Sequence, residues 1–229
     1  LGQFYHINVD TQTPYNVYGG LQDNGSWRGP AYEYQWSGIG NFQWDNVGWG
    51  DGFDVVPDRS DPRYCYSMSQ GGYLNRVDMQ TNDSRYIRPI HPLNIPLRFN
   101  WNAGISSDPF NPTTIYYGSQ FLHKSTNRGD TWQIISPDLT TNDTTKQKQL
   151  ESGGLTYDVT AAENHCTIIS IAPSPVQQGV LWVGTDDGNV QVTTNAGATW
   201  ANVVRNIKGA PESTWVPQIQ ASTHNAGEA

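Results

Sequence analysis

The stretch STNRGDTW, residues 125–132, decides the fold because it returns as TTNAGATW at residues 193–200. Asn tolerates left-handed backbone geometry and can bond nearby backbone, Gly supplies positive φ, and Trp anchors a turn by apolar burial. We therefore predict two copies of one structural turn, each joining the third and fourth strands of a repeated sheet. The shared positions are Ser125, Asn127, Gly129, Thr131 and Trp132 in the first copy, and Thr193, Asn195, Gly197, Thr199 and Trp200 in the second.

The first copy contains Arg128-Gly129-Asp130, a tripeptide that many extracellular ligands show to adhesion receptors. The second copy has Ala196 and Ala198 at the positions of Arg128 and Asp130. We therefore interpret Arg128 and Asp130 as the variable positions of a turn motif rather than as part of an adhesion signal.

A longer repeat of about fifty residues surrounds these turns. Pro14, Pro62 and Pro112 lie 48 and 50 residues apart, each in a turn between two short alternating stretches. The composition, with 23 Gly, 9 Trp and 12 Tyr, suits many short strands joined by tight turns. A four-stranded repeat of this length is typical of a β-propeller. The fold class that we predict is all-β, a β-propeller of four-stranded antiparallel blades.

Four blades are predicted, near residues 1–45, 46–95, 96–145 and 146–207, and WVPQIQAST in 208–229 reads as the first strand of a further blade. A polar insertion over residues 140–165 displaces the fourth copy and reads as an exposed excursion. We expect residues 1–229 to be part of a larger propeller whose remaining blades come from the same or another chain.

The charge balance excludes some partners. The net charge is −8, from 13 Lys and Arg against 21 Asp and Glu, so we expect no nucleic-acid binding. No apolar run is long enough to span a bilayer. Cys65 and Cys166 allow one disulfide without demanding it, and neither lies in a CxxC pair that would suggest zinc.

The repeated turn resembles the Asp-box pattern of bacterial-neuraminidase-type repeats. The whole chain resembles secreted bacterial proteins with sortilin-like, Asp-box propellers that are labelled glycosyl hydrolases. The resemblance rests on residues 14–26, 48–62, 98–112, 125–139 and 180–200. The resemblance implies a secreted, periplasmic or cell-surface location and carbohydrate binding. No cofactor is predicted.

Two enzyme families have a similar architecture. For each of them, a residue difference argues against the same activity in this chain. WDNVGWGDGF, residues 44–53, resembles the entry of xyloglucan-degrading endoglucanases, but Gln70 stands where that resemblance would place a catalytic Asp. Glutamine cannot act as a general acid or base. Sialidases need three clustered arginines, and YIRP, residues 86–89, falls on a predicted outer strand instead. Sialidase activity is therefore disfavoured.

In a propeller, the first strand of each blade lines the channel. The loops entering first strands share one face with the turns between second and third strands, and the Asp-box turns lie opposite. We predict ligand-binding residues on the first of these faces, because tryptophans, amides and carboxylates suit sugars. They are Trp49, Gln70, Asp23, Arg98, Asn100, Trp101, Asn102, His165 and Asp186.

Asp51 and Glu163 are the candidate catalytic carboxylates, since a glycosidase needs such a pair about 5–10 Å apart. Structural alternatives stand beside these predictions. Asp51 between Gly50 and Gly52 could be a turn residue, and the turn interpretation is favoured for Asp23 and Asp186. A Ca²⁺ at Asp186 lacks evident further ligands, and His165 is better explained as a packed residue, so no metal site is predicted.

Residues 27–52 hold seven aromatic side chains, which could form a buried patch or an exposed platform for glycan or peptide.

Three functions remain open. The favoured one is a non-catalytic extracellular or cell-surface module that binds glycan or peptide. The alternatives are a glycoside hydrolase using Asp51 and Glu163, and a structural part of a larger surface complex.

The repeated turn makes a first testable prediction. Replacing both Arg128 and Asp130 with Ala should leave the free energy of unfolding nearly unchanged, because the second copy has Ala at both positions. Trp132→Ala should cost several kcal/mol through lost burial. Denaturant unfolding of both variants measures this, and a large loss of stability in the double variant would contradict the interpretation that these two positions can vary.

Overall fold

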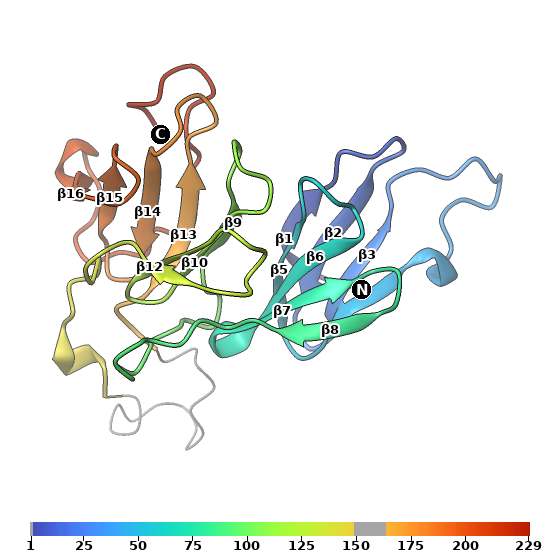
Figure 1. Ribbon diagram of the computed structural model, residues 1–229, viewed down its shortest axis with the longest axis horizontal. Helices are drawn as coiled ribbons and strands as arrows, with labels where there is room; N and C mark the ends of the chain where they lie inside the picture. The colour runs from blue at the N-terminus through green and yellow to red at the C-terminus, as the bar shows by residue number, and fades with distance from the viewer. Residues whose placement is uncertain (1, 149–163) are drawn as a thin grey trace. The chain divides into compact units, whose positions relative to one another are not determined.

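The computed structural model describes residues 2–148 and 164–229, in which the strands form four four-stranded antiparallel sheets (Figure 1). Consecutive strands are neighbours in every sheet, so each sheet is an up-and-down blade. The predicted all-β propeller fold with four blades is confirmed.

The first blade comprises β1 (Phe4–Val9), β2 (Asn16–Leu21), β3 (Gly25–Pro30) and β4 (Asp45–Gly48). The second comprises β5 (Gly52–Pro57), β6 (Tyr64–Ser69), β7 (Tyr73–Asp78) and β8 (Asp83–Tyr86). The third comprises β9 (Ile105–Ser107), β10 (Ile115–Gly118), β11 (Leu122–Ser125) and β12 (Gln133–Ile134). The fourth comprises β13 (Ile168–Pro173), β14 (Leu181–Thr185), β15 (Val190–Thr193) and β16 (Ala201–Asn202).

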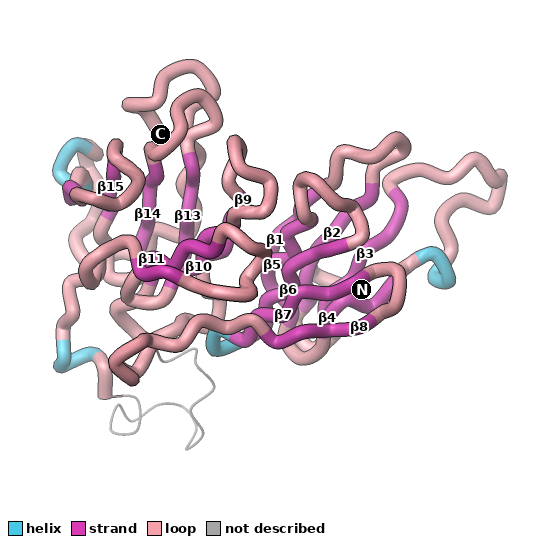
Figure 2. Tube along the Cα trace, in the orientation of Figure 1, coloured by secondary structure: helices cyan, strands magenta, loops and turns pink. Residues whose placement is uncertain are grey.

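Loops and four single-turn 3₁₀ helices make up the rest of the described chain (Figure 2). The helices are η1 (Asn41–Gln43), η2 (Gln70–Gly72), η3 (Thr144–Lys146) and η4 (Val204–Asn206). The first blade extends to Gly48, past the boundary expected at residue 45. Residues 208–229, where a further first strand is predicted, form no paired strand.

The chain divides into two compact units, Leu1–Arg88 with the first two blades and Pro89–Ala229 with the other two. Within the first unit, β2 packs closely on β5. A Cβ atom at Gly20 would come within 2.1 Å of the backbone of Gly52, so only glycine fits there. The apolar core between these blades comprises Tyr18, Val47, Val55, Cys65 and Val77. In the second unit, the core between the third and fourth blades comprises Tyr116, Leu122, Leu139, Ile168, Ile171, Leu181 and Val183.

The two repeated turns do join third and fourth strands, and they share one hydrogen-bond pattern. The Ser125 hydroxyl accepts N–H groups from Asn127 and Gly129, and the Asn127 side chain accepts the N–H of Thr131 at 2.9 Å. Thr193, Asn195, Gly197 and Thr199 repeat these bonds in the second copy.

The backbone of these turns differs in one respect from expectation. The left-handed residues beside each glycine are Arg128 (φ 59°) and Ala196 (φ 57°), not the asparagines. The asparagine side chain is used instead to accept the N–H four residues on. Ala196 shows that no polar side chain is required at the left-handed position.

A second repeated device, which the sequence interpretation missed, closes the turn after the first strand of three blades. An aspartate at the end of the first strand accepts N–H groups from the turn and the hydroxyl of a buried tyrosine on the second strand. The pairs are Tyr18 with Asp10 at 3.1 Å, Tyr66 with Asp58 at 2.7 Å and Tyr116 with Asp108 at 2.6 Å.

The fourth blade replaces both members of this pair. Ser174 takes the place of the aspartate, and its hydroxyl accepts the N–H groups of Val176 and Gln177. Trp182 takes the place of the tyrosine. Its indole N–H has no hydrogen-bond partner in the described part of the chain.

The hydrogen bonds of the first such turn favour the charged carboxylate. Burial raises the pKa of Asp10, but the bonds donated by Asn16, Gln12 and Tyr18 outweigh it and hold that pKa below its usual value.

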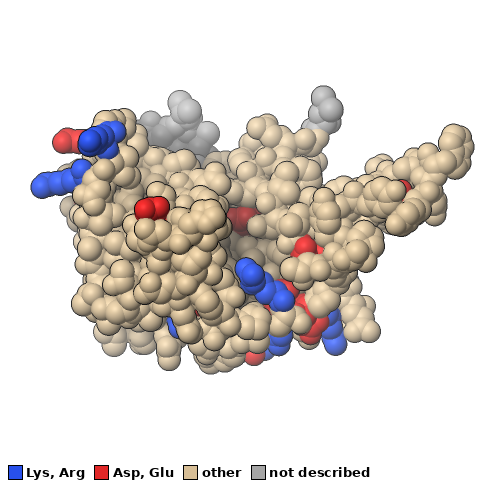
Figure 3. All heavy atoms as spheres, turned by 90° about the horizontal axis from the view of Figure 1, so that it is seen from above, with Lys and Arg blue, Asp and Glu red and all other residues tan. Residues whose placement is uncertain are grey.

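The aromatic cluster predicted in residues 27–52 is mostly exposed. Between β3 and β4 the chain forms an arm, residues 31–44, on which Tyr34 is 86%, Trp36 101% and Phe42 82% exposed. The surface carries few charged side chains on this arm (Figure 3). These three rings of the arm are therefore exposed to solvent and do not belong to the core.

Cys65 and Cys166 are buried free thiols. In residues 2–148 and 164–229, no helix has the length and apolar character to cross a bilayer.

The aspartate–tyrosine pair gives a testable prediction. Tyr116→Phe removes the hydroxyl that donates to Asp108, which is only 4% exposed, and leaves a buried carboxylate oxygen without that donor. The free energy of unfolding should fall by about 1–3 kcal/mol. Tyr15→Phe, at a residue 49% exposed, is the control and should stay near wild type. Equal stability of both variants in urea would show that the pair contributes nothing.

Candidate functional site

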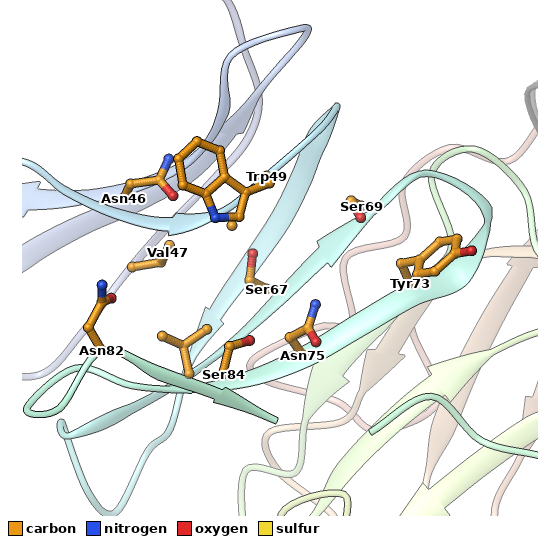
Figure 4. Close-up of a pocket in the computed structure, with 11 residues that line it drawn as sticks. Asn46, Val47, Trp49, Ser67, Ser69, Tyr73, Asn75, Asn82 and Ser84 are labelled. Carbon is orange, nitrogen blue, oxygen red and sulfur yellow. The ribbon is translucent and has the colours of Figure 1, made fainter. Parts of the chain in front are cut away.

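A pocket of about 260 Å³ lies in the first unit, between β4 of the first blade and β6, β7 and β8 of the second (Figure 4). Successive residues of a strand point to opposite faces. Ser67 and Ser69 of β6 therefore share one face, as do Tyr73 and Asn75 of β7. The lining residues are Asn46, Val47, Gly48, Trp49, Ser67, Ser69, Tyr73, Asn75, Val77, Asn82 and Ser84.

Two aromatic rings stand at this pocket. Trp49, in the loop from β4 to β5, is 83% exposed, and Tyr73, at the start of β7, is 55% exposed. Figure 4 shows Ser67, Ser69 and Asn75 between the two rings. The pocket therefore combines exposed ring faces with hydroxyl and amide groups, and no charged side chain lines it.

The predicted residues of the first unit come together beside this pocket. The Asp51 carboxylate accepts the N–H of Asp23 at 2.6 Å, and the Gln70 side-chain oxygen accepts the N–H of Asp51 at 3.0 Å. Gly50, in a left-handed conformation, accepts the N–H of Gly25 and completes the link. Trp49 leads directly into this link, so its position depends on it.

The two carboxylates of this link form a negative region at the end of the first two blades. Burial and then the charges of Asp51 and Asp23 raise the pKa of Tyr5. One oxygen of Asp51 is already used by the Asp23 N–H. The other proposed carboxylate, Glu163, lies outside the described residues, so the pair has no measured geometry.

The predicted residues of the second unit form a buried polar network. Asn100 and Asp186 are fully buried, and the Asn100 amide donates to the Asp186 carboxylate at 3.0 Å. Thr167 donates to the same carboxylate through its N–H at 2.8 Å and its hydroxyl at 2.6 Å. Burial raises the pKa of Asp186 despite these bonds. The polar groups of Asn100 and Asp186 therefore already form hydrogen bonds within the protein.

The remaining predicted residues lie around this network. Arg98 forms an ion pair with Asp138 at 2.8 Å and donates to the Cys166 carbonyl. The Asn102 N–H binds the Asn100 side chain, and the His165 ring lies 3.4 Å from the Cys166 sulfur. Trp101 is half-buried beside them. The structure brings Arg98, Asn100 and Asp186 into one region.

A side-chain hydrogen-bond acceptor recurs just after the second strand of three blades, and its role explains Gln70. The side chains of Gln70, Gln120 and Asp186 each accept an N–H from the loop that enters the first strand of the same blade. The donors are Asp51 at 3.0 Å, Arg98 at 2.8 Å and Thr167 at 2.8 Å. Gln70 therefore has a positioning contact at the place where an acid was expected by resemblance.

Sequence reasoning missed most of the pocket. Asn46, Ser67, Ser69, Tyr73, Asn75, Asn82 and Ser84 were not among the candidates. Their available signal was modest: Ser67 and Ser69 alternate on a strand whose neighbouring positions are apolar. The described residues contain no group of three or more His, Cys, Asp or Glu that could hold a metal ion.

No protein-family model matches the chain, and no curated protein matches it significantly.

The link between Gln70 and Asp51 can be tested by amide hydrogen exchange. Gln70→Ala removes the acceptor of the Asp51 N–H, so exchange at Asp51 should accelerate by roughly three- to ten-fold, the equivalent of one ordinary hydrogen bond. Gln70→Glu keeps an acceptor oxygen and is the matched control. Unchanged exchange in Gln70→Ala would show that the contact does not hold the loop.

Proposed function

We propose that this protein is a non-catalytic β-propeller module, of the Asp-box and sortilin-like type, that binds a neutral glycan between Trp49 and Tyr73. The observation that carries the proposal is the uncharged pocket with two exposed rings and a hydroxyl and amide lining. Aromatic rings offer broad apolar faces for the C–H face of a sugar. Amide and hydroxyl groups both donate and accept, as sugar hydroxyls require.

The charge of the site supports a neutral ligand. No Lys or Arg lines the pocket, and Asp23 and Asp51 lie beside it. An acidic sugar or a phosphate would meet repulsion without a compensating cation. A peptide ligand remains the alternative, because β4 and β8, which also line the pocket, are the outer strands of their sheets and an extended peptide can pair with such an edge. The two exposed rings and the hydroxyl and amide lining favour the sugar.

The absence of catalysis is supported by the lining of the pocket. Glycoside hydrolysis uses two carboxyl groups flanking the bond, whereas no carboxylate lines this pocket. Hydrolysis by Asp51 and Glu163 is the alternative. A reducing-sugar assay with Asp51→Asn and Glu163→Gln as controls tests it, and activity lost in both variants would favour the hydrolase.

A structural role in a larger surface complex is favoured by one feature, the arm of residues 31–44. Trp36 on this arm is fully exposed, and large apolar side chains displayed in this way mark contact surfaces. The repeated turns, the low charge and the resemblance of residues 48–62 and 180–200 support a secreted or cell-surface bacterial protein.

The proposal is tested by a glycan array followed by calorimetry with the neutral oligosaccharide that binds. Trp49→Ala and Tyr73→Ala should each weaken binding at least ten-fold, since a central aromatic residue contributes about 2 kcal/mol or more. Trp36→Ala removes a fully exposed tryptophan from the arm, and this variant should bind like wild type. A silent array, or equal affinities in all three variants, would refute a glycan site here.

A further inference from the structure

Residues 216–228 repeat the structure of β13 and its following turn 48 positions later, although they form no paired strand. The Ile168 N–H at the start of β13 donates to the Ser119 carbonyl of the third blade at 2.8 Å. The Val216 N–H donates in the same way to the Thr185 carbonyl of the fourth blade at 3.0 Å. Each of these residues therefore begins its segment with a hydrogen bond to the end of the second strand of the preceding blade.

The turn after the segment repeats as well. The Ser174 N–H donates to the Val180 carbonyl at 2.9 Å, and 48 residues on the Ser222 N–H donates to the Glu228 carbonyl at 3.0 Å. The Ser174 hydroxyl accepts N–H groups two and three residues on, and the Ser222 hydroxyl does the same. The same turn closes the first strand of every described blade.

The packing contacts of this segment also repeat those of β13 at the same offset of 48 residues. A Cβ atom at Gly118 would meet Ile168 at 2.5 Å, and one at Gly184 would meet Val216 at 2.7 Å. Ile219 packs on the outer apolar cluster of the fourth blade. Ile171, its counterpart, packs between the third and fourth blades. Residues 216–221 therefore hold the position and register of a first strand.

This first strand differs from β13 in its neighbours. Five residue pairs join β13 to β14, whereas Pro217 has no backbone N–H and residues 218–221 donate theirs to no described residue. Beside them lies an apolar groove of about 640 Å³, lined by Trp182, Val190, Val192, Val203, Ile219 and Ala226 among others. Between the third and fourth blades, Leu181 and Val183 of β14 belong to the core that fills the corresponding space.

We propose that this groove is an acceptor for a β-hairpin of the blade type. The first strand of that hairpin pairs antiparallel with residues 216–221. Its alternate apolar side chains enter the groove against Trp182 and Ile219, as Leu181 and Val183 do one blade earlier. A strand is favoured over a small apolar ligand because the backbone N–H groups of residues 218–221, which donate to no described residue, lie beside the groove, and another strand would accept them.

The probe is a synthetic peptide with residues 176–193 of this protein, which carries the β14–β15 hairpin. It should bind the protein 1:1, and amide exchange at residues 218–221 should slow when it is bound. Ile219→Asp should weaken binding at least ten-fold, whereas the matched control Ile90→Asp, at a residue 80% exposed, should not. A peptide with Asp at both 181 and 183 should not bind.

Three results would overturn the proposal. The first is no binding of the peptide to protein whose circular dichroism and thermal unfolding are normal. The second is binding without slower exchange at residues 218–221, which would mean an apolar ligand site and not strand pairing. The third is self-association in sedimentation that Ile219→Asp abolishes, which would make a second copy the occupant. The glycan site is in the other unit, so loss of sugar binding leaves these outcomes unaffected.

Discussion

The structure depends on a small polar contact at the end of the first strand of each blade. In three blades a buried aspartate holds the turn by its N–H groups and takes the hydroxyl of a tyrosine from the second strand. The contact fixes where the chain reverses and which residues of the first two strands face each other. A shift by one residue would turn the apolar side chains of a strand to the wrong face. Core packing between blades therefore relies on these turns.

The fourth blade shows that the two positions act as a unit. Ser174 still holds the turn, but it offers no carboxylate to a tyrosine, and Trp182 occupies the facing position. A carboxylate beside that indole would be buried without the hydroxyl donor that the other blades supply. The change of both residues together preserves the turn while the ring still fills the core.

The fold was predictable because its signals are local and repeated. The two turns at 125–132 and 193–200 and the spacing of Pro14, Pro62 and Pro112 give the blade length. The alternation of residues gives the strands. The aspartate–tyrosine pair was present eight residues apart in three repeats, but its two members become partners only when the turn between them is folded.

The site was less predictable because it forms where two blades meet, from strands of both blades. Trp49, Asp23, Asp51 and Gln70 were identified from loops, and the structure places them together. Asn46, Ser67 and Asn75 lie on strands, where polar residues are usually solvent-facing, so nothing local marks them as a pocket lining. Asn100 and Asp186 resemble ligand groups in sequence but are buried and hydrogen-bonded to each other.

The uncharged lining of the Trp49 and Tyr73 pocket has a consequence for the conditions under which it would work. A site built on ion pairs weakens as salt screens its charges, and one built on carboxylates or imidazoles changes with pH. No Asp, Glu, His, Lys or Arg lines this pocket. Binding of the proposed neutral glycan there would therefore change little with salt concentration or with mild acidification.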